Sequence, residues 1–295
     1  MTKKCTTDII ETFNEQNQEE GVRVFVAGGN RAGKNPLYVE EAYNLGKQIV
    51  KVGFKLSFGV GNAGIMGAVA RGVMDTWNKK TCGGSPITGI TTKEYLSLYP
   101  TDDKLIKSIS NLRVADTLED RKKQLLEADI IVFAPGGVGT LDELAYDMVA
   151  MQDGFIPKKP FVMYNVNGYF YHLLEYLKDM SSEGFADPVP FIVVDNYEEL
   201  VIAFRLLKHR YKKAKTNKEV YANTRQLIYE LPYFVKKKTG KDIFVEHIVD
   251  EINEINSKGT AEERQTLAEE IEQAYLEKEI ERMHERLVIA GRNTG

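Results

Sequence analysis

A glycine-rich segment at residues 135–143, with the sequence PGGVGTLDE, has the residue types of an anion-binding turn. It directly follows the apolar run 130–134, which predicts a buried strand, and directly precedes residues 144–149, which predict a helix. Such a turn directs free backbone N–H groups and the positive end of a helix dipole at one point, and glycines let an anion approach closely. With the carboxylate of Glu143 beside it, the segment predicts chemistry on a nucleotide or a sugar phosphate.

Glu143 also has a purely structural interpretation. Residues 140–143 fit the T-x-x-E pattern of a capping box, in which the two side chains satisfy the first N–H groups of a helix. Such a cap stabilises a helix by about 1 kcal/mol and requires no catalysis. In this interpretation Asp142 only complements the helix dipole.

Two further glycine-rich segments follow predicted strands. Residues 28–35 have the GxxxxGK spacing of a P-loop, but Asn35 replaces the Ser/Thr that would bind Mg²⁺, and Pro36 interrupts the first helical turn. These departures argue against an NTPase. Residues 59–64 match GxGxxG, but they follow the second strand, and Glu94 is a poor candidate for the acid that would bind ribose. An NAD-dependent enzyme is therefore a less favoured alternative.

The composition is that of an ordinary globular protein. The chain has 295 residues, of which 43% are hydrophobic and 28% charged, and its net charge of −4 favours neither a nucleic-acid nor a membrane partner. Residues 1–20 are polar, so we expect no signal peptide, and no run approaches the ~18 apolar residues of a membrane span. Cys5 and Cys82 form no metal or disulfide pattern, and the histidines have no ligand spacing. We expect a cytoplasmic protein that needs no cofactor or metal ion.

Strand and helix patterns alternate as far as about residue 205. The predicted strands are residues 22–27, 54–58, 87–90, 112–114, 130–134, 161–165 and 191–194. This alternation predicts an α/β fold with a doubly wound parallel sheet of Rossmann-like type, in which ligands bind at the carboxyl ends of the strands. We divide the chain into a polar N-terminal segment (1–20), a Rossmann-like nucleotide-binding catalytic domain (21–205) and a helical C-terminal extension (206–295).

The C-terminal extension is charged and rich in helix patterns. Its basic run, 208–218, is typical of a solvated face or a linker. A helix near the C-terminus has apolar residues with alternating spacings of four and three, which favours packing on its own domain over a short coiled coil. These residues are Leu276, Ile280, Met283, Leu287 and Ala290.

Taken together, the glycine-rich segments resemble those of the LONELY GUY (LOG) family of nucleoside 5′-monophosphate phosphoribohydrolases, often labelled "possible lysine decarboxylase". The resemblance covers roughly residues 20–205, and the family motif PGGxGTxxE is complete at 135–143. Residues 59–67 match the family's second glycine loop, except that Val60 stands where we expect glycine. Residues 165–170 and 183–185 resemble its downstream segments. The family's catalytic arginine corresponds to Arg121, with a spacing to the motif one residue shorter than expected.

The resemblance implies hydrolysis of the N-glycosidic bond of a nucleotide, such as AMP or a cytokinin-type modified AMP, to free base and ribose 5-phosphate. Glu143 would stabilise an oxocarbenium-like transition state or activate water. Arg121 would contact phosphate or ribose, or steady the leaving base and the glutamate. The 5′-phosphate would lie on the backbone N–H groups of Gly136, Gly137, Gly139 and Thr140. The expected substrate pocket includes Gly61, Asn62, Gly64 and Met66.

Two further alternatives stay open at this stage. Taken alone, Arg121 is typical of a surface ion pair with Glu119 or Asp120. The same phosphate site could also serve a non-catalytic nucleotide sensor that signals through the C-terminal helices. The family resemblance further implies a homodimer or a higher homo-oligomer, whereas the sequence alone does not identify the base or the role of the extension.

Overall fold

The computed structural model describes residues 21–77, 86–98, 103–109, 111–188, 191–214, 217–237 and 245–292. The predicted N-terminal segment 1–20 lies outside these residues, as do Cys5 and Cys82 and part of the basic run. In the described part of the chain, no helix is both long enough and apolar enough to cross a membrane.

The predicted parallel sheet is confirmed. It has seven strands in the order β4-β3-β2-β1-β5-β6-β7, and every neighbouring pair is parallel. All seven predicted strands form, within a few residues of the expected bounds. They are β1 (Arg23–Ala27), β2 (Lys55–Phe58), β3 (Ile87–Thr92), β4 (Asn111–Ala115), β5 (Ile130–Phe133), β6 (Phe161–Tyr164) and β7 (Phe191–Val194).

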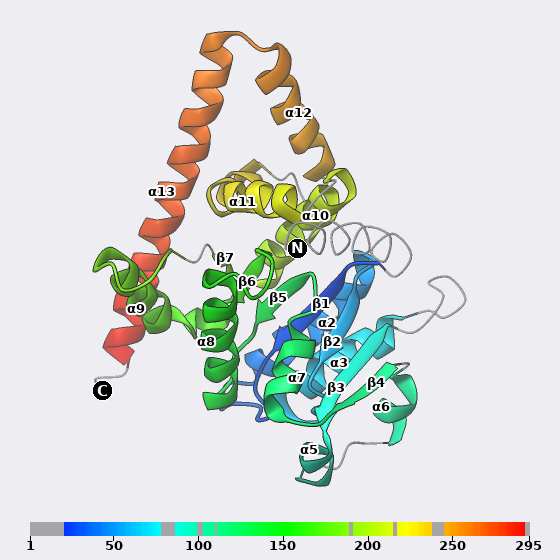
Figure 1. The fold of residues 1–295 in the computed structure, drawn as a ribbon. Coiled ribbons are helices and arrows are strands. Elements are labelled where there is room, and N and C mark those ends of the chain that lie inside the picture. The colour runs from blue at the N-terminus through cyan, green and yellow to red at the C-terminus, as the bar shows by residue number, and fades with distance from the viewer. Residues whose placement is uncertain are drawn as a thin grey trace.

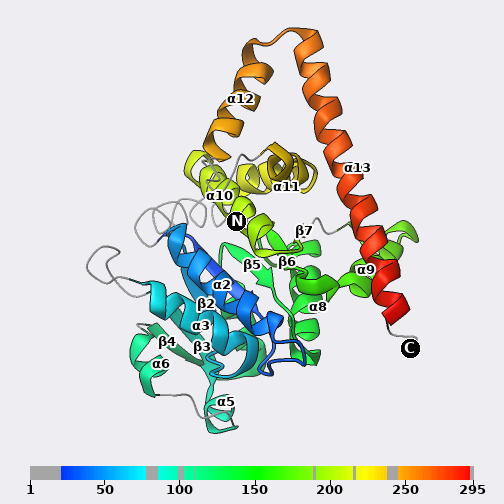
Figure 2. The same cartoon turned by 180° about the vertical axis from the view of Figure 1, so that it is seen from behind.

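Helices cover both faces of the sheet (Figures 1 and 2), which confirms the doubly wound arrangement. One face packs against α2 (Leu37–Lys51), α3 (Gly64–Thr76) and α10 (Tyr197–Lys213), and the other against α7 (Leu118–Leu125), α8 (Val138–Gln152) and α9 (Tyr171–Ser182). Strand residues alternate between the two cores, with Val24 in one and Phe25 in the other. The short helices α5 (Lys93–Leu98) and α6 (Asp103–Ser108) connect β3 to β4, and the 3₁₀ turn η1 (Val166–Gly168) precedes α9.

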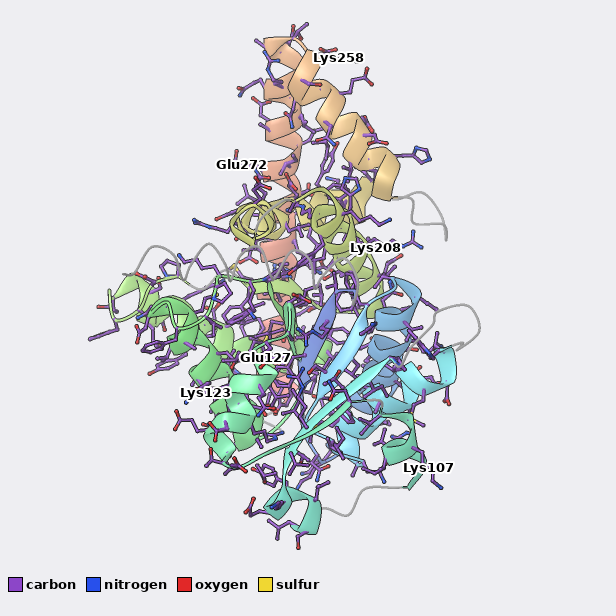
Figure 3. The ribbon with its side chains drawn as sticks, turned by 45° about the vertical axis from the view of Figure 1, so that its right-hand side comes forward. Lys107, Lys123, Glu127, Lys208, Lys258 and Glu272 are labelled. Atoms are coloured by element: carbon purple, nitrogen blue, oxygen red, sulfur yellow. The ribbon has the colours of Figure 1, made fainter. Side chains whose placement is uncertain are left out.

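The C-terminal extension consists of α11 (Asn217–Lys237), α12 (Val245–Lys258) and α13 (Ala261–Arg292). Helices α12 and α13 rise above the sheet as an arm, on which Lys258 and Glu272 lie far from the strands (Figure 3), and α13 then runs back beside α9 (Figures 1 and 2). The predicted division at residue 205 falls inside α10, which is continuous, so the domain bounds stay a prediction.

The apolar stripe of α13 does not pack on its own domain as expected. Leu276, Ile280 and Met283 are each about half exposed, at 48%, 52% and 55%. The helix instead contacts the domain through the opposite face, where Lys278 and Arg282 form buried ion pairs. The structure does not describe the side chains of Leu287 and Ala290. The apolar stripe therefore did not predict which face of α13 packs against the domain.

Glycines allow α2 and α3 to pack backbone against backbone. A Cβ on Gly46 of α2 would collide with the carbonyl oxygen of Val69 on α3, and a Cβ on Gly72 would collide with that of Tyr43. This close contact fixes α3, whose N-terminus begins at the second glycine loop. The site therefore depends on how these helices pack.

We predict that Gly46→Ala destabilises the protein, because a new methyl group must separate two packed backbones. The expected cost is about 1–3 kcal/mol, which corresponds to a fall in Tm of about 5 °C. Gly139→Ala is the matched control, because no atom lies within 4 Å of its added Cβ. Thermal unfolding followed by circular dichroism measures both; an equal Tm for the two variants would contradict this account of the helix contact.

Candidate active site

The three glycine-rich segments meet at one edge of the sheet. They follow β1, β2 and β5, which are neighbours in the sheet, so their loops converge at the carboxyl ends of the strands. All three loops line a cavity of about 710 Å³, together with Arg121 and Glu143. The first loop, which resembles a P-loop, therefore contributes to the same cavity as the other two.

The turn before α8 has the open backbone expected of an anion site. Helix α8 begins at Val138, with Gly137 as its N-cap and without a capping side chain. Nothing lies within 4 Å of a Cβ built on Gly137 or Gly139, so this face of the backbone is accessible. Gly136 instead lies under the hydroxyl of Thr140, where a Cβ would not fit. The first N–H groups of α8 thus remain available to a ligand.

The capping-box interpretation of residues 140–143 is wrong. Because α8 starts at Val138, Thr140 lies within its first turn and Glu143 within its second. Neither residue is at the position that a capping box requires. For the same reason Asp142 is not a first-turn acid; it pairs with Lys122 at 2.6 Å. The carboxylate of Glu143 is thus free of any capping role.

Arg121 and Glu143 lie together in the cavity. Arg121 is only 8% exposed, and its Nη1 lies 3.5 Å from Oε1 of Glu143. Its Nε donates to the carbonyl of Ile90 at 3.3 Å, and its guanidinium lies 5.1 Å from the centre of the Tyr95 ring. Thr117 caps α7 and so fixes the helix that carries the arginine.

The alternative of a surface ion pair for Arg121 is also wrong. Its two acidic neighbours have other partners: Glu119 pairs with Lys123 at 2.9 Å, and Asp120 bonds to Thr117. These contacts occur on the exposed side of α7, whereas Arg121 is turned into the cavity.

The second glycine loop makes room for the arginine. A Cβ on Gly59 would overlap Nη2 of Arg121, so glycine at this position lets the guanidinium lie against the loop. Gly61 and Met66, two of the residues that we expected in the substrate pocket, also line this cavity. Asn62 and Gly64 do not line it: the carbonyl of Asn62 accepts a hydrogen bond from Arg71, and Gly64 packs against the backbone of Arg31.

Three aromatic residues that we did not predict also line the cavity. They are Tyr38, Tyr95 and Tyr169. The hydroxyl of Tyr169 donates a hydrogen bond to the carbonyl of Gly136, and its ring meets Tyr38 edge to face at 5.6 Å. The family-like segment 165–170 indicated the neighbourhood of Tyr169 but no role for it, and nothing in the sequence pattern marked Tyr38 or Tyr95.

Burial raises the pKa of Glu143, and the charge of Arg121 opposes that rise. One helical turn further along α8, Asp147 is only 2% exposed, and no group of the described residues bonds to its Oδ2. Burial, and then the negative charge of Glu143, raise the pKa of Asp147 to about 8, against the opposing charge of Lys159. Two acids with raised pKa values on one helix face are typical of functional sites.

A second, larger cavity of about 920 Å³ lies between β7, α9, α11 and α13. It contains none of the predicted site residues. The four histidines lie on α9, α10, α12 and α13, away from the smaller cavity, and among the described residues no group of three His, Cys, Asp or Glu side chains could hold a metal ion. We place the candidate site in the smaller cavity, because it holds the glycine loops, the acid and the arginine.

Much of this chain is similar to known proteins. The family model described as "possible lysine decarboxylase" matches residues 66–204. The cytokinin riboside 5′-monophosphate phosphoribohydrolase LOG7 of Arabidopsis thaliana is 30% identical over 191 residues, which cover 63% of this chain and 82% of that protein. The chain belongs to the LOG family. The resemblance predicted from its motifs is thereby confirmed.

Other LOG relatives match a similar part of the chain. The probable phosphoribohydrolase LOGL1 of Oryza sativa subsp. japonica is 29% identical, over 72% of this chain and 88% of its own length. Among solved structures, the molybdenum cofactor carrier protein of Chlamydomonas reinhardtii aligns with a TM-score of 0.43 at 21% identity, over 62% of this chain and 94% of that one.

The one departure from the LOG glycine loop has a structural consequence. Val60 replaces the expected glycine and has φ of 63°, in the left-handed region that β-branched residues rarely adopt. Its side chain is nevertheless 3% exposed, buried next to Gly89. The site loop therefore holds backbone strain of about 1–3 kcal/mol, which burial of the valine side chain offsets.

We predict that Asp147 makes the protein less stable as pH rises from about 4, its unfolded pKa, to about 8, its folded pKa. Over that range the folded state holds a proton that the unfolded state has lost, so stability falls by at most about 1.4 kcal/mol per pH unit. Asp147→Asn should remove this pH-dependent loss, so the variant should be more stable than the wild type, most of all at the alkaline end of the range. Urea unfolding of both proteins at several pH values tests it; parallel pH profiles would contradict the assignment.

Proposed function

We propose that this LOG-family chain hydrolyses the N-glycosidic bond of a nucleoside 5′-monophosphate and releases free base and ribose 5-phosphate. The observation that supports this most strongly is the placement of Glu143 against Arg121 in one cavity with the open turn before α8. The names of the curated relatives, which are phosphoribohydrolases, support the same reaction.

The turn before α8 would hold the 5′-phosphate. The N–H groups of Gly137, Gly139 and Thr140 belong to the start of a 15-residue helix, so they add to its positive end. A phosphate fixed at this point orients the ribose toward Glu143, which lies on the next turn of α8. Binding energy from the phosphate is thereby used to position the C1′ carbon for cleavage.

Glu143 would act on the ribose as the C1′–N bond breaks. Positive charge develops on the sugar in an oxocarbenium-like transition state, and a carboxylate stabilises it or accepts the proton of the attacking water. The water oxygen bonds to C1′, and the departing base takes a proton. Arg121, already beside Glu143 and bonded to Ile90, would hold the carboxylate in place or contact the ribose.

Apolar and aromatic side chains would receive the base. The apolar and aromatic residues Tyr38 of α2, Met66 of α3, and Tyr95 and Leu96 of α5 line the cavity. Aromatic rings stack on nucleobases without selecting one by hydrogen bonds. AMP and a cytokinin-type modified AMP are therefore our proposed substrates, the second on the analogy of the relatives' names. A cytoplasmic location and a homo-oligomer, which the resemblance implied, stay predictions.

The test is a panel of nucleoside 5′-monophosphates incubated with the purified protein without added metal or NAD. We expect free base and ribose 5-phosphate in equal amounts from at least one of them. The matching nucleoside is the control; because it lacks the group that the α8 turn binds, its kcat/KM should be at least about 100-fold lower.

Two results would contradict parts of this proposal. Tight nucleotide binding without base release across the panel would favour the non-catalytic sensor. Equal turnover of a nucleotide and its nucleoside would show that the turn before α8 does not bind the phosphate.

A further inference from the structure

Two cations of α13, Arg282 and Lys278, contact Asp195 at the end of the sheet, Lys278 at 3.3 Å, but Arg282 also bonds to the strand itself. Arg282 of α13 donates from Nε to Oδ2 of Asp195 at 2.8 Å and from Nη2 to the carbonyl of Val193 at 3.0 Å. Strand β7 is the last of the sheet, so this guanidinium supplies a donor on a side where the sheet has no further strand. The side chains of Arg282 and Asp195 are only 16% and 10% exposed, so solvent screens their contact weakly.

Asp195 links this arginine to the neighbouring strand. Asp195 follows β7, and Asn165 follows β6, so the two side chains lie at the same carboxyl edge of the sheet. Nδ2 of Asn165 donates to Oδ1 of Asp195 at 2.8 Å, and Oδ1 of Asn165 accepts from the backbone N–H of Phe170 at 2.8 Å. Asn165 is 3% exposed. Its side chain therefore holds both ends of the turn 165–170 against Asp195.

That turn carries Tyr169 to the phosphate-binding loop. The ring of Tyr169 packs on Phe170 at 5.0 Å, and its hydroxyl donates to the carbonyl of Gly136. The peptide between Gly136 and Gly137 is planar and trans, so its C=O and N–H point in opposite directions. A hydrogen bond that fixes the carbonyl of Gly136 therefore also fixes the direction of the Gly137 N–H, one of the donors at the start of α8.

We propose that Arg282 of the C-terminal extension is a positioning residue for the phosphate-binding loop, acting through Asp195, Asn165 and Tyr169. Hydrogen bonds form every link except the last step within the turn, where Phe170, which Asn165 holds, is the covalent and packing neighbour of Tyr169. The extension thereby sets the orientation of a backbone donor that no residue of the extension touches. This inference rests on the proposed function only where it names ribose 5-phosphate as the ligand.

The first test compares two single variants of the full-length protein. Arg282→Met should weaken binding of ribose 5-phosphate, and raise KM for the nucleotide, about 5-fold with kcat nearly unchanged. Lys236→Met is the matched control: it removes another ion pair of α13, to Glu277 at 2.8 Å, which is exposed and does not reach Asp195. Lys278 stays beside Asp195 in each variant, and Arg282→Lys adds back a second cation and should recover part of the loss. Equal affinities in Arg282→Met and wild type would overturn the proposal.

A double-mutant cycle separates positioning from general destabilisation. Tyr169→Phe removes the hydroxyl that contacts Gly136 and should itself weaken binding of ribose 5-phosphate. If Arg282 acts through that hydroxyl, Arg282→Met should have no further effect on affinity in the Tyr169→Phe protein, although its effect on Tm remains. Additive losses of affinity would overturn the proposal.

Hydrogen exchange provides a readout that needs no ligand. The N–H of Leu141 bonds to the carbonyl of Gly137 at 3.1 Å, so its exchange reports opening of the first turn of α8. We expect exchange in the segment that includes Leu141 to be about 5-fold faster in Arg282→Met and unchanged in Lys236→Met. Faster exchange in a protein that releases no base would leave the positioning role intact and reject only the proposed function. Unchanged exchange would reject the positioning role itself.

Discussion

The contact between Arg121 and Glu143 is the interaction on which the proposed chemistry depends. It joins α7 to α8 across the carboxyl edge of the sheet, and both side chains are largely buried. Burying an ion pair costs several kcal/mol unless its groups are well bonded, and here the carbonyl of Ile90 and the ring of Tyr95 complete the surroundings of the guanidinium. Gly59 has no side chain and so leaves room for the guanidinium of Arg121. The pair and its surroundings therefore depend on α7, α8, β3, α5 and the loop at Gly59 being in place together.

The raised pKa values on α8 follow from the same burial. Water is largely excluded from Glu143 and Asp147, which disfavours their charged forms, and only Glu143 has an arginine beside it. The two acids are thereby held in different electrostatic environments on one helix face. This difference suits a site in which one carboxylate reacts and the other stays protonated near neutral pH.

The sequence predicted most of the fold because the strand signals are local. Each buried strand is a short apolar run, and the alternation with helices specifies a parallel sheet whatever the details of packing. The apolar stripe of Leu276, Ile280 and Met283 gave a wrong prediction, because periodicity identifies an apolar face of a helix but not what that face contacts. Helix α13 packs on the domain through ion pairs instead. The capping box was wrong because it placed the N-cap at Thr140, whereas the N-cap of α8 is Gly137, three residues earlier.

At the site, the motif identified residues that share one loop but not those that arrive from elsewhere. Glu143 and the glycines before it are contiguous, and Arg121 was found through its family position. Tyr38, Tyr95 and Tyr169 come from three separate elements, and only tertiary packing brings them to one cavity. The chain of contacts from Arg282 to Gly136 likewise could not be predicted from the sequence. Its residues lie far apart in the sequence, and none belongs to a motif that indicates a contact.

Base release by Glu143→Gln, measured beside binding of ribose 5-phosphate, tests the central claim most directly. Glutamine keeps an oxygen that can accept from Arg121 but removes the negative charge. The account predicts that kcat falls at least about 100-fold while affinity for ribose 5-phosphate stays close to wild type. Asp142→Asn is the control, because that neighbouring acid pairs outward with Lys122 and should leave the rate unchanged. A Glu143→Gln protein that releases base at the wild-type rate would contradict the account.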